Sequence, residues 1–249
     1  MSNSFRVVIP VRYASSRLPG KPLLTFQHKP IIEHVYKNAC DSEAESVLIA
    51  TDDERIADAA SKFDAQVCMT SLDHMSGTDR ITEAVEQQGW PDNDVIVNLQ
   101  GDEPQMPAAN IKQVAQLLLN NPNAAIGTLC HRIHTIQEYD DPNVVKVTKN
   151  SKSRALYFSR SSLPYIRNVD VKVLKENNVF RHVGIYSYRI NYLKQFIKMP
   201  ASPLEQIEKL EQLRALENGD EIVVEECIQY PGIGVDTMDD YHRLKISSQ

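Results

Sequence analysis

Short apolar runs alternate with longer amphipathic stretches along the first half of the chain. The apolar runs are rich in β-branched residues and too short for helices, so they predict buried strands over 7–9, where Pro10 bounds the run, and over 46–50, 66–69 and 95–99. Apolar residues at helical spacing predict helices over 30–39, 54–63, 76–88 and 107–120. Strand, helix and strand at this spacing are typical of a mostly parallel sheet with right-handed crossovers, and we therefore expect an α/β fold.

The pattern changes near residue 125. Strand-like segments follow at 125–133, 144–148, 155–159 and 180–188, with few helices expected between them. They predict antiparallel strands attached to the parallel core. We therefore expect one domain over residues 1–249, in which residues 125–190 form an antiparallel insertion. The polar stretch 170–178 is expected to be an exposed loop.

A capping box at 202–205 predicts the start of the strongest helix in the chain, over 203–218. Gly219 is expected to end this helix. Its core-facing stripe consists of Leu204, Ile207, Leu210 and Leu213. Glu211 and Gln212 fall near the stripe, so they either face a cavity or an interface, or are solvated as most such residues are.

The composition narrows the class of protein. At 249 residues the chain can bury a sizeable core, and its net charge of −6 argues against general nucleic-acid binding. Four widely spaced cysteines without a C-x-x-C pair are typical of reduced thiols, not of a disulfide framework or a zinc site. No apolar run reaches membrane-spanning length, and no signal-peptide pattern is present. We therefore expect a soluble, cytoplasmic protein without nucleic-acid or membrane partners.

The loop after the first strand concentrates positive charge. Arg12, Arg17 and Lys21 stand in it, with Ser15 between the arginines. Such groups at the C-terminal end of a first strand suit an anion, because these strand ends line the ligand crevice of open α/β sheets. A solvated basic loop is the alternative, but the proline and glycine residues within 19–22 indicate a fixed backbone. The loop matches neither a Walker A motif nor a dinucleotide fingerprint.

Two acidic residues stand at the ends of other predicted strands. Asp102 follows the strand over 95–99, and Asp236 lies after a last predicted strand over 221–227, just before a helix capped by Thr237. A carboxylate at the end of a strand, as at Asp102, can hold Mg²⁺, which takes one or two protein carboxylates and fills its remaining positions with water and phosphate oxygens. The alternative is that each residue serves only a turn or a helix cap.

These motifs together resemble sugar cytidylyltransferases, most of all the 3-deoxy-manno-octulosonate (Kdo) cytidylyltransferase family. The basic loop has the form I-P-x-R-x-x-S-x-R-L-P-G-K-P-L. The later motifs, in the order of the family, are D-H-x-S-G-T, Q-G-D-E-P, F-S-R, R-H-x-G-I-Y-x-Y-R, S-P-L-E with L-E-Q-L-R, and G-V-D-T. The resemblance spans essentially the whole chain. Met75 and Ala201 depart from the family pattern, with no expected consequence for the chemistry.

The resemblance implies a nucleotide-diphospho-sugar transferase type of fold, a mixed, mostly parallel sheet flanked by helices. It also implies that CMP is transferred from CTP to Kdo, giving CMP-Kdo and pyrophosphate for lipopolysaccharide biosynthesis. The family is usually dimeric through the region 125–190, so a homodimer is expected. Two alternatives stay open: the same chemistry on another acidic sugar, such as 8-amino-Kdo or a sialic acid, and a catalytically silent nucleotide-binding protein.

The resemblance also assigns roles to individual residues. The implied catalytic residues are Arg12, Lys21, Asp102 and Asp236. The implied CTP-binding residues are Arg12, Ser15, Arg17, Lys21, Ser76, Gly77 and Arg80. The implied sugar-binding residues are Gln100, Arg160, His182, Tyr186, Glu211 and Gln212. Mg²⁺ is the implied cofactor, held by Asp102 and Asp236, whose carboxylates are then expected roughly 4–6 Å apart.

Overall fold

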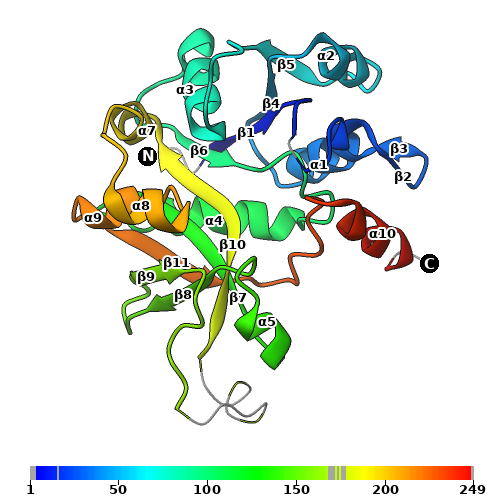
Figure 1. The fold of residues 1–249 in the computed structure, drawn as a ribbon. Coiled ribbons are helices and arrows are strands. Elements are labelled where there is room, and N and C mark those ends of the chain that lie inside the picture. Colours follow the sequence, from blue (N-terminus) through cyan, green and yellow to red (C-terminus); the bar gives the residue numbers. More distant parts are fainter. Residues whose placement is uncertain (1–3, 16, 168–171, 173, 175–177, 248–249) are drawn as a thin grey trace.

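The computed structural model describes residues 4–15, 17–167, 172, 174 and 178–247 (Figure 1). Within these residues nine strands form one sheet, in the order β11-β7-β10-β6-β1-β4-β5, with β8 and β9 branching from β10. The strands of the sheet are β1 (Phe5–Val11), β4 (Ser46–Thr51), β5 (Gln66–Met69), β6 (Val95–Asn98), β7 (Ile126–Arg132), β8 (Lys146–Lys149), β9 (Ala155–Ser159), β10 (Phe180–Arg189) and β11 (Ile222–Glu226). Two further short strands, β2 (Thr25–Phe26) and β3 (Lys29–Pro30), pair with each other.

The sheet is parallel in its first half and mixed in its second. β1 pairs in parallel with both β4 and β6, and β4 pairs in parallel with β5. β10 is antiparallel to β6, β7 and β8, whereas β11 is parallel to β7. The predicted mixed, mostly parallel sheet with an antiparallel part is therefore confirmed. The antiparallel strands are not a detached unit, because β10 lies between β6 and β7 inside the main sheet.

Helices cover both faces of the sheet (Figure 1). The helices are α1 (Ile31–Cys40), α2 (Glu54–Ser61), α3 (Gly77–Gln88), α4 (Ala108–Leu119), α5 (Ile136–Asp140), α7 (Ile190–Phe196), α8 (Pro203–Glu208), α9 (Leu213–Glu217) and α10 (Met238–Ile246). One core cluster joins α1, α2, α4 and α10 to alternate residues of β1, including Val7 and Ile9. The other cluster joins α3, α7 and α9 to Val8, which points to the opposite face. The central strands are therefore buried on both sides, as their continuous apolar runs predict.

The single helix predicted over 203–218 is wrong. The segment forms two short helices, α8 and α9, because Lys209 adopts a left-handed conformation with φ 54° and ψ 46° and ends α8. Ile207, which was expected in the core stripe, is 78% exposed. Arg214 of α9 instead forms an ion pair with Glu205 of α8 at 2.6 Å. Tertiary contacts of this kind override a local helical preference.

The remaining comparisons with the sequence concern two helices, one loop and membrane-spanning segments. The sequence pattern missed α5, which Thr135 caps, and α7, which follows β10 directly. Most of the segment 170–178, expected to be an exposed loop, lies outside the described residues. Among the described residues, no helix combines the length and the apolar character needed to cross a membrane.

Candidate active site

The basic loop after β1 is held in one conformation by its own backbone. The amide nitrogen of Gly20 donates to the carbonyl oxygen of Tyr13 at 2.9 Å, and that of Leu23 donates to the carbonyl oxygen of Gly20 at 2.9 Å. Gly20 has a left-handed φ of 72°, and a Cβ there would lie 3.0 Å from the Tyr13 ring. The guanidinium of Arg55 covers that ring at 3.4 Å from its centroid. In the described part of the loop, these contacts fix the backbone at Tyr13 and at Gly20, the position that requires a residue without a Cβ.

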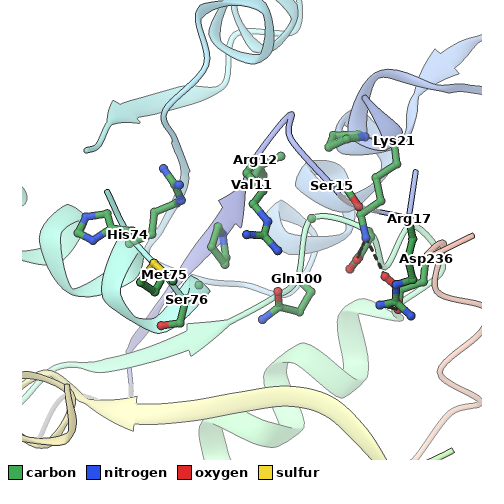
Figure 2. Close-up of a pocket in the computed structure, with 16 residues that line it drawn as sticks. Val11, Arg12, Ser15, Arg17, Lys21, His74, Met75, Ser76, Gln100 and Asp236 are labelled. Carbon is green, nitrogen blue, oxygen red and sulfur yellow. Dashed lines mark hydrogen bonds and ion pairs between the residues drawn. The ribbon is translucent and has the colours of Figure 1, made fainter. Parts of the chain in front are cut away.

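A pocket of about 250 Å³ lies beyond the C-terminal ends of β1 and β6 (Figure 2). This is the edge at which open α/β sheets bind ligands. All residues assigned to CTP by resemblance line it: Arg12, Ser15, Arg17, Lys21, Ser76, Gly77 and Arg80. Gln100, Asp102 and Asp236 line the same pocket. The structure thus brings together residues from the two ends of the chain.

Lys21 is the centre of a charge cluster in this pocket. Its Nζ donates to the carboxylates of Asp102 and, at 2.9 Å, of Asp236. Arg17 approaches the other oxygen of Asp236 at 3.0 Å. Burial lowers the pKa of Lys21, but the two carboxylates outweigh it, so the net pKa is raised above its usual 10.5. Lys21 is therefore a permanent cation held between two anions.

The same two carboxylates suit a hard divalent cation. Because one oxygen of each contacts the same nitrogen, these oxygens lie within roughly 6 Å of each other, which agrees with the separation expected from the sequence. Burial, together with the neighbouring charge of Asp102, raises the pKa of Glu103 to about 8. Glu103 is therefore mostly protonated near pH 7. Among the described residues no group of three or more His, Cys, Asp or Glu side chains is arranged for a metal ion. Two carboxylates completed by substrate phosphates are nevertheless a donor set that fits Mg²⁺.

The opposite wall of the pocket is the start of α3. The hydroxyl of Ser76 caps this helix by accepting a hydrogen bond from the amide of Asp79 at 3.1 Å. In return, the Asp79 carboxylate accepts a hydrogen bond from the amide of Ser76. This reciprocal cap fixes the start of α3 beside the pocket. Arg80 is nearly buried, and its guanidinium donates to Asp52 at 2.6 Å, so internal partners already hold it.

Arg12 differs from the other cations of the pocket. It is exposed, and Figure 2 shows its side chain extending into the pocket. Within the described part of the chain it makes no ion pair or hydrogen bond. Its guanidinium is therefore available to a ligand. Five donors in a planar fork suit phosphate oxygens.

A wider hollow of about 910 Å³ adjoins the pocket and shares Arg17, Asp102 and Asp236 with it. Arg160, assigned to the sugar by resemblance, lines this hollow. Its guanidinium donates to the carbonyl oxygens of Glu208 at 2.7 Å and Pro142 at 3.1 Å. These bonds fix the direction of its fork and leave part of its donor set unused.

The two residues of β10 that are assigned to the sugar have different neighbours: Tyr186 lies against β6, and His182 is the register partner of Cys130 on β7. Tyr186 is the register partner of Asn98, whose side-chain oxygen accepts from Gln100 at 2.9 Å. The rings of His182 and Tyr186 lie 5.2 Å apart. Burial, assisted by the charge of Arg181, lowers the pKa of His182 to about 3, and burial raises the pKa of Tyr186. Both side chains are therefore neutral near pH 7.

Glu211 and Gln212, the last two residues assigned to the sugar, lie in the break between α8 and α9. Glu211 accepts a hydrogen bond from Thr78 of α3, next to the nucleotide-side pocket, and burial raises its pKa. Gln212 is only 4% exposed, and its Nε2 has no hydrogen-bond partner among the described residues. A buried donor without a partner calls for an explanation, and a bound ligand supplies one.

Sequence reasoning missed residues that support the site from behind. Lys146 is fully buried on β8 and donates to the carbonyl oxygens of Arg160 at 2.7 Å and Asp141 at 2.8 Å. Asn98 connects Gln100 to Tyr186. The available signal was a polar residue inside a strand-like apolar run, which both positions show.

The chain is similar to known cytidylyltransferases over nearly its whole length. A family model described as cytidylyltransferase matches residues 6–222. The chain is 49% identical to the 3-deoxy-manno-octulosonate cytidylyltransferase of Thioalkalivibrio sulfidiphilus, over 97% of this chain and 98% of that protein. It is 50% identical to the protein of the same name from Cellvibrio japonicus, over 97% of each chain.

Solved structures agree with this likeness. A CMP:2-keto-3-deoxy-manno-octonic acid synthetase complexed with CTP superimposes with a TM-score of 0.89 at 40% identity, over 98% of each chain. A nucleotidyl transferase from Methanothermobacter thermautotroptrophicus, 14% identical over 99% of this chain and 98% of its own, has a TM-score of 0.63 and shows the shared fold alone. By its family model, its sequence identities and its fold, the chain belongs to the 3-deoxy-manno-octulosonate cytidylyltransferase family.

Proposed function

We propose that this chain transfers CMP from CTP to the anomeric hydroxyl of Kdo, giving CMP-Kdo and pyrophosphate. Relatives of this name match nearly its whole length, and the similar solved structure was obtained with CTP. The observation that supports the proposal most directly is one pocket in which Arg12, Lys21, Asp102 and Asp236 converge. The comparisons do not favour another acidic sugar or a catalytically silent protein.

The nucleotide side supplies the charge for phosphoryl transfer. Arg12, with Arg17 and Lys21, would neutralise the triphosphate. The sugar hydroxyl would attack the α-phosphorus in line; its oxygen forms the new bond and its proton passes to water, while the bond to the bridging oxygen breaks and pyrophosphate leaves with that electron pair. Such catalysis consists mainly of positioning and charge stabilisation. A basic pocket at the sheet edge is suited to both.

Asp102 and Asp236 would hold Mg²⁺. When bound there, the ion would polarise the α-phosphate and lower the pKa of the attacking hydroxyl. The two carboxylates would orient its remaining positions toward the phosphates, and Lys21 between them would keep the local charge balanced.

The sugar would lie against the wall formed by β10, the α8–α9 turn and the end of β9. Arg160 suits its carboxylate because a guanidinium fork can bind both oxygens. The neutral groups of His182, Tyr186 and Gln212 suit its hydroxyls, and so do Gln100 and Glu211, which complete the assigned set.

Pyrophosphate release tests this assignment. We expect release from CTP and Kdo in the presence of Mg²⁺, and much slower release with 8-amino-Kdo or a sialic acid under the same conditions. Equal rates with all three sugars would contradict the proposed specificity. No release with any of them would support a catalytically silent protein.

We also propose a homodimer formed mainly through residues 125–190. Leu156 on the outer strand β9 is 60% exposed, and an uncovered antiparallel edge tends to pair with another chain. A twofold arrangement would use the same patch on both subunits. Light scattering should give twice the chain mass, and Leu156→Asp should shift it toward the monomer, whereas Leu72→Asp at another exposed position should not. A monomeric wild type at micromolar concentration contradicts the proposal.

A cytoplasmic location is proposed as well, for a CMP-Kdo supply to lipopolysaccharide biosynthesis. All four cysteines are free, which is typical of a reducing compartment. Cell fractionation with an antibody to the chain tests this location, and recovery in an oxidising compartment would contradict it.

A further inference from the structure

The ring of His182 is anchored from behind by a buried hydroxyl. Thr128 of β7 is fully buried, and its Oγ1 lies 2.9 Å from Nε2 of His182. The same oxygen donates to the carbonyl oxygen of Ile185 at 2.8 Å, with that of Val183 farther away at 3.4 Å. The hydroxyl, the ring and these carbonyl oxygens come together because the pairing of β10 with β7 shifts register between Val183 and Tyr186.

Three possible acceptors surround this hydroxyl, and the carbonyl oxygen of Ile185 is the nearest of them. A threonine hydroxyl has a single hydrogen, and a carbonyl oxygen can only accept. The hydrogen therefore goes to Ile185, which leaves only a lone pair of Thr128 facing Nε2. That contact is a hydrogen bond only if Nε2 of His182 carries a hydrogen and donates it.

We propose that Thr128 is a positioning residue that holds His182 in the tautomer with hydrogen on Nε2, so that Nδ1 accepts a hydrogen bond from a hydroxyl of the sugar. Nδ1 has no hydrogen-bond partner within the described part of the chain. The lone pair of Nδ1 repels a carboxylate but can accept a hydrogen bond from a hydroxyl. His182 therefore binds a sugar hydroxyl, and Arg160 binds the sugar carboxylate. The role in sugar recognition rests on the proposed function; the tautomer rests on the geometry alone.

The surroundings of the ring keep it neutral and oriented. The edge of Phe158, from β9, meets it at 85° with centroids 5.1 Å apart, and Tyr186 lies on another side at 5.2 Å. On β7, its register partner is Cys130, whose thiol burial keeps protonated. Burial and the charge of Arg181 oppose a second proton on the ring and lower its pKa. A neutral ring has one donor and one acceptor, and Thr128 determines which nitrogen is which.

The opposite tautomer conflicts with this arrangement. With hydrogen on Nδ1, the Thr128 hydroxyl would have to donate to Nε2, and the carbonyl of the fully buried Ile185 would lose this hydrogen bond. Breaking a buried hydrogen bond is disfavoured. The backbone amide of His182 donates to the carbonyl of Val145 at 2.7 Å, so the strand cannot easily shift to restore it.

The tautomer can be measured directly. In the full chain labelled with ¹⁵N-histidine, nitrogen shifts of the imidazoles distinguish protonated from unprotonated Nδ1 and Nε2. We expect His182 to show a protonated Nε2 and an unprotonated Nδ1 throughout pH 6–8 in the wild type. A protonated Nδ1, in either a neutral or a charged ring, overturns the proposal. This measurement requires no variant and no substrate.

Two variants then test the role of the hydroxyl. Thr128→Val removes it at nearly constant shape, and Thr128→Ser keeps it as the matched control. We expect Thr128→Val to shift His182 toward a mixture of tautomers and to raise KM for Kdo about tenfold with KM for CTP unchanged, because a buried polar group without its partner discriminates poorly. Thr128→Ser should restore both readouts. A wild-type tautomer and wild-type KM in Thr128→Val would refute the positioning role.

Analogues of Kdo that each lack one hydroxyl show which sugar hydroxyl His182 binds. The wild type should lose affinity for one of them in particular, and Thr128→Val should lose most of that discrimination. If Thr128→Val discriminates among the analogues as strongly as the wild type, the proposal fails. Failure of the wild type to release pyrophosphate from CTP and Kdo would instead overturn the proposed function and leave the tautomer result standing.

Discussion

The two walls of the site handle charge in opposite ways. On the nucleotide side, Lys21 is paired with Asp102 and Asp236, and Arg80 with Asp52, whereas Arg12 has no partner within the described part of the chain. On the proposed sugar side, burial keeps the side chains of His182, Tyr186 and Tyr188 neutral. The first wall stands on loops after parallel strands, whereas the second follows the antiparallel strand β10.

This difference means that the two walls contribute to ligand recognition in different ways. The cations of the first wall stabilise a triphosphate strongly but do little to distinguish one anion from another. Neutral donors and acceptors such as His182 and Gln212 distinguish ligands by the hydrogen bonds that a wrong ligand leaves unmade. We therefore expect substitutions on the first wall to remove turnover and substitutions on the second wall to change sugar preference.

The largest effect is expected at the carboxylates. Asp102→Asn or Asp236→Asn should leave a folded protein whose kcat falls about 10³-fold or more, because charge stabilisation of the phosphates is the main catalytic term. Pyrophosphate release and circular dichroism measure turnover and folding, and chelation of Mg²⁺ should reduce the wild type to the same level. Asp92→Asn, which breaks the exposed pair with Lys194, is the control. Wild-type kcat in either active-site variant would show that turnover does not depend on that carboxylate, and would contradict the role given to the first wall.

Arg160 tests whether the second wall acts on the sugar alone. Arg160→Ala should raise KM for Kdo about 10–100-fold, since a charge-assisted pair with the carboxylate is lost, and should leave the Kd for CTP unchanged. Steady-state kinetics and calorimetry with CTP provide the two values. Arg154→Ala, which removes an ion pair with Glu221 outside both pockets, is the matched control. Equal losses for both ligands would show that the division is wrong.

The neutrality of His182 has a consequence for stability. Its pKa is about 3 in the folded chain and near 6.5 when unfolded, so only the unfolded state binds the extra proton as the pH falls below 6.5. This contribution is present above pH 6.5, and about 1–2 kcal/mol of it should be lost by pH 5. Denaturant unfolding at pH 7 and pH 5 should show a smaller loss in His182→Asn. His242→Asn, at an exposed position, is the control, and equal losses in all three chains would contradict the expectation.

The smallest effect is expected at Gln212, and it has opposite signs for stability and function. Gln212→Leu removes a buried donor without a partner, so the free energy of unfolding should rise by about 1 kcal/mol. KM for Kdo should rise severalfold, because the donor intended for the sugar is gone. Denaturant titration and kinetics give the two values, with Gln206→Leu as a control at an exposed position. A less stable variant with unchanged KM would mean that Gln212 is structural.

The sequence by itself determined the parallel core and the basic loop. β-Branched runs and helical spacing act over a few residues, which is why β5 and β9 have the predicted bounds. Proline and glycine restrict the backbone locally, and a capping box needs only four residues, as at Ser76. The motifs were enough to indicate the family before any fold was known.

Only the tertiary structure decided how distant residues meet. Helical spacing predicted one helix through Lys209, but the Glu205–Arg214 pair and the contact of Glu211 with Thr78 favour the break. Asp102 and Asp236 meet on Lys21 because β6 and the segment before α10 end at the same edge of the sheet. Thr128 was not singled out by any pattern. Its hydroxyl acquires its role from a register shift between two strands, and the register of strands distant in sequence depends on the packing of the whole sheet.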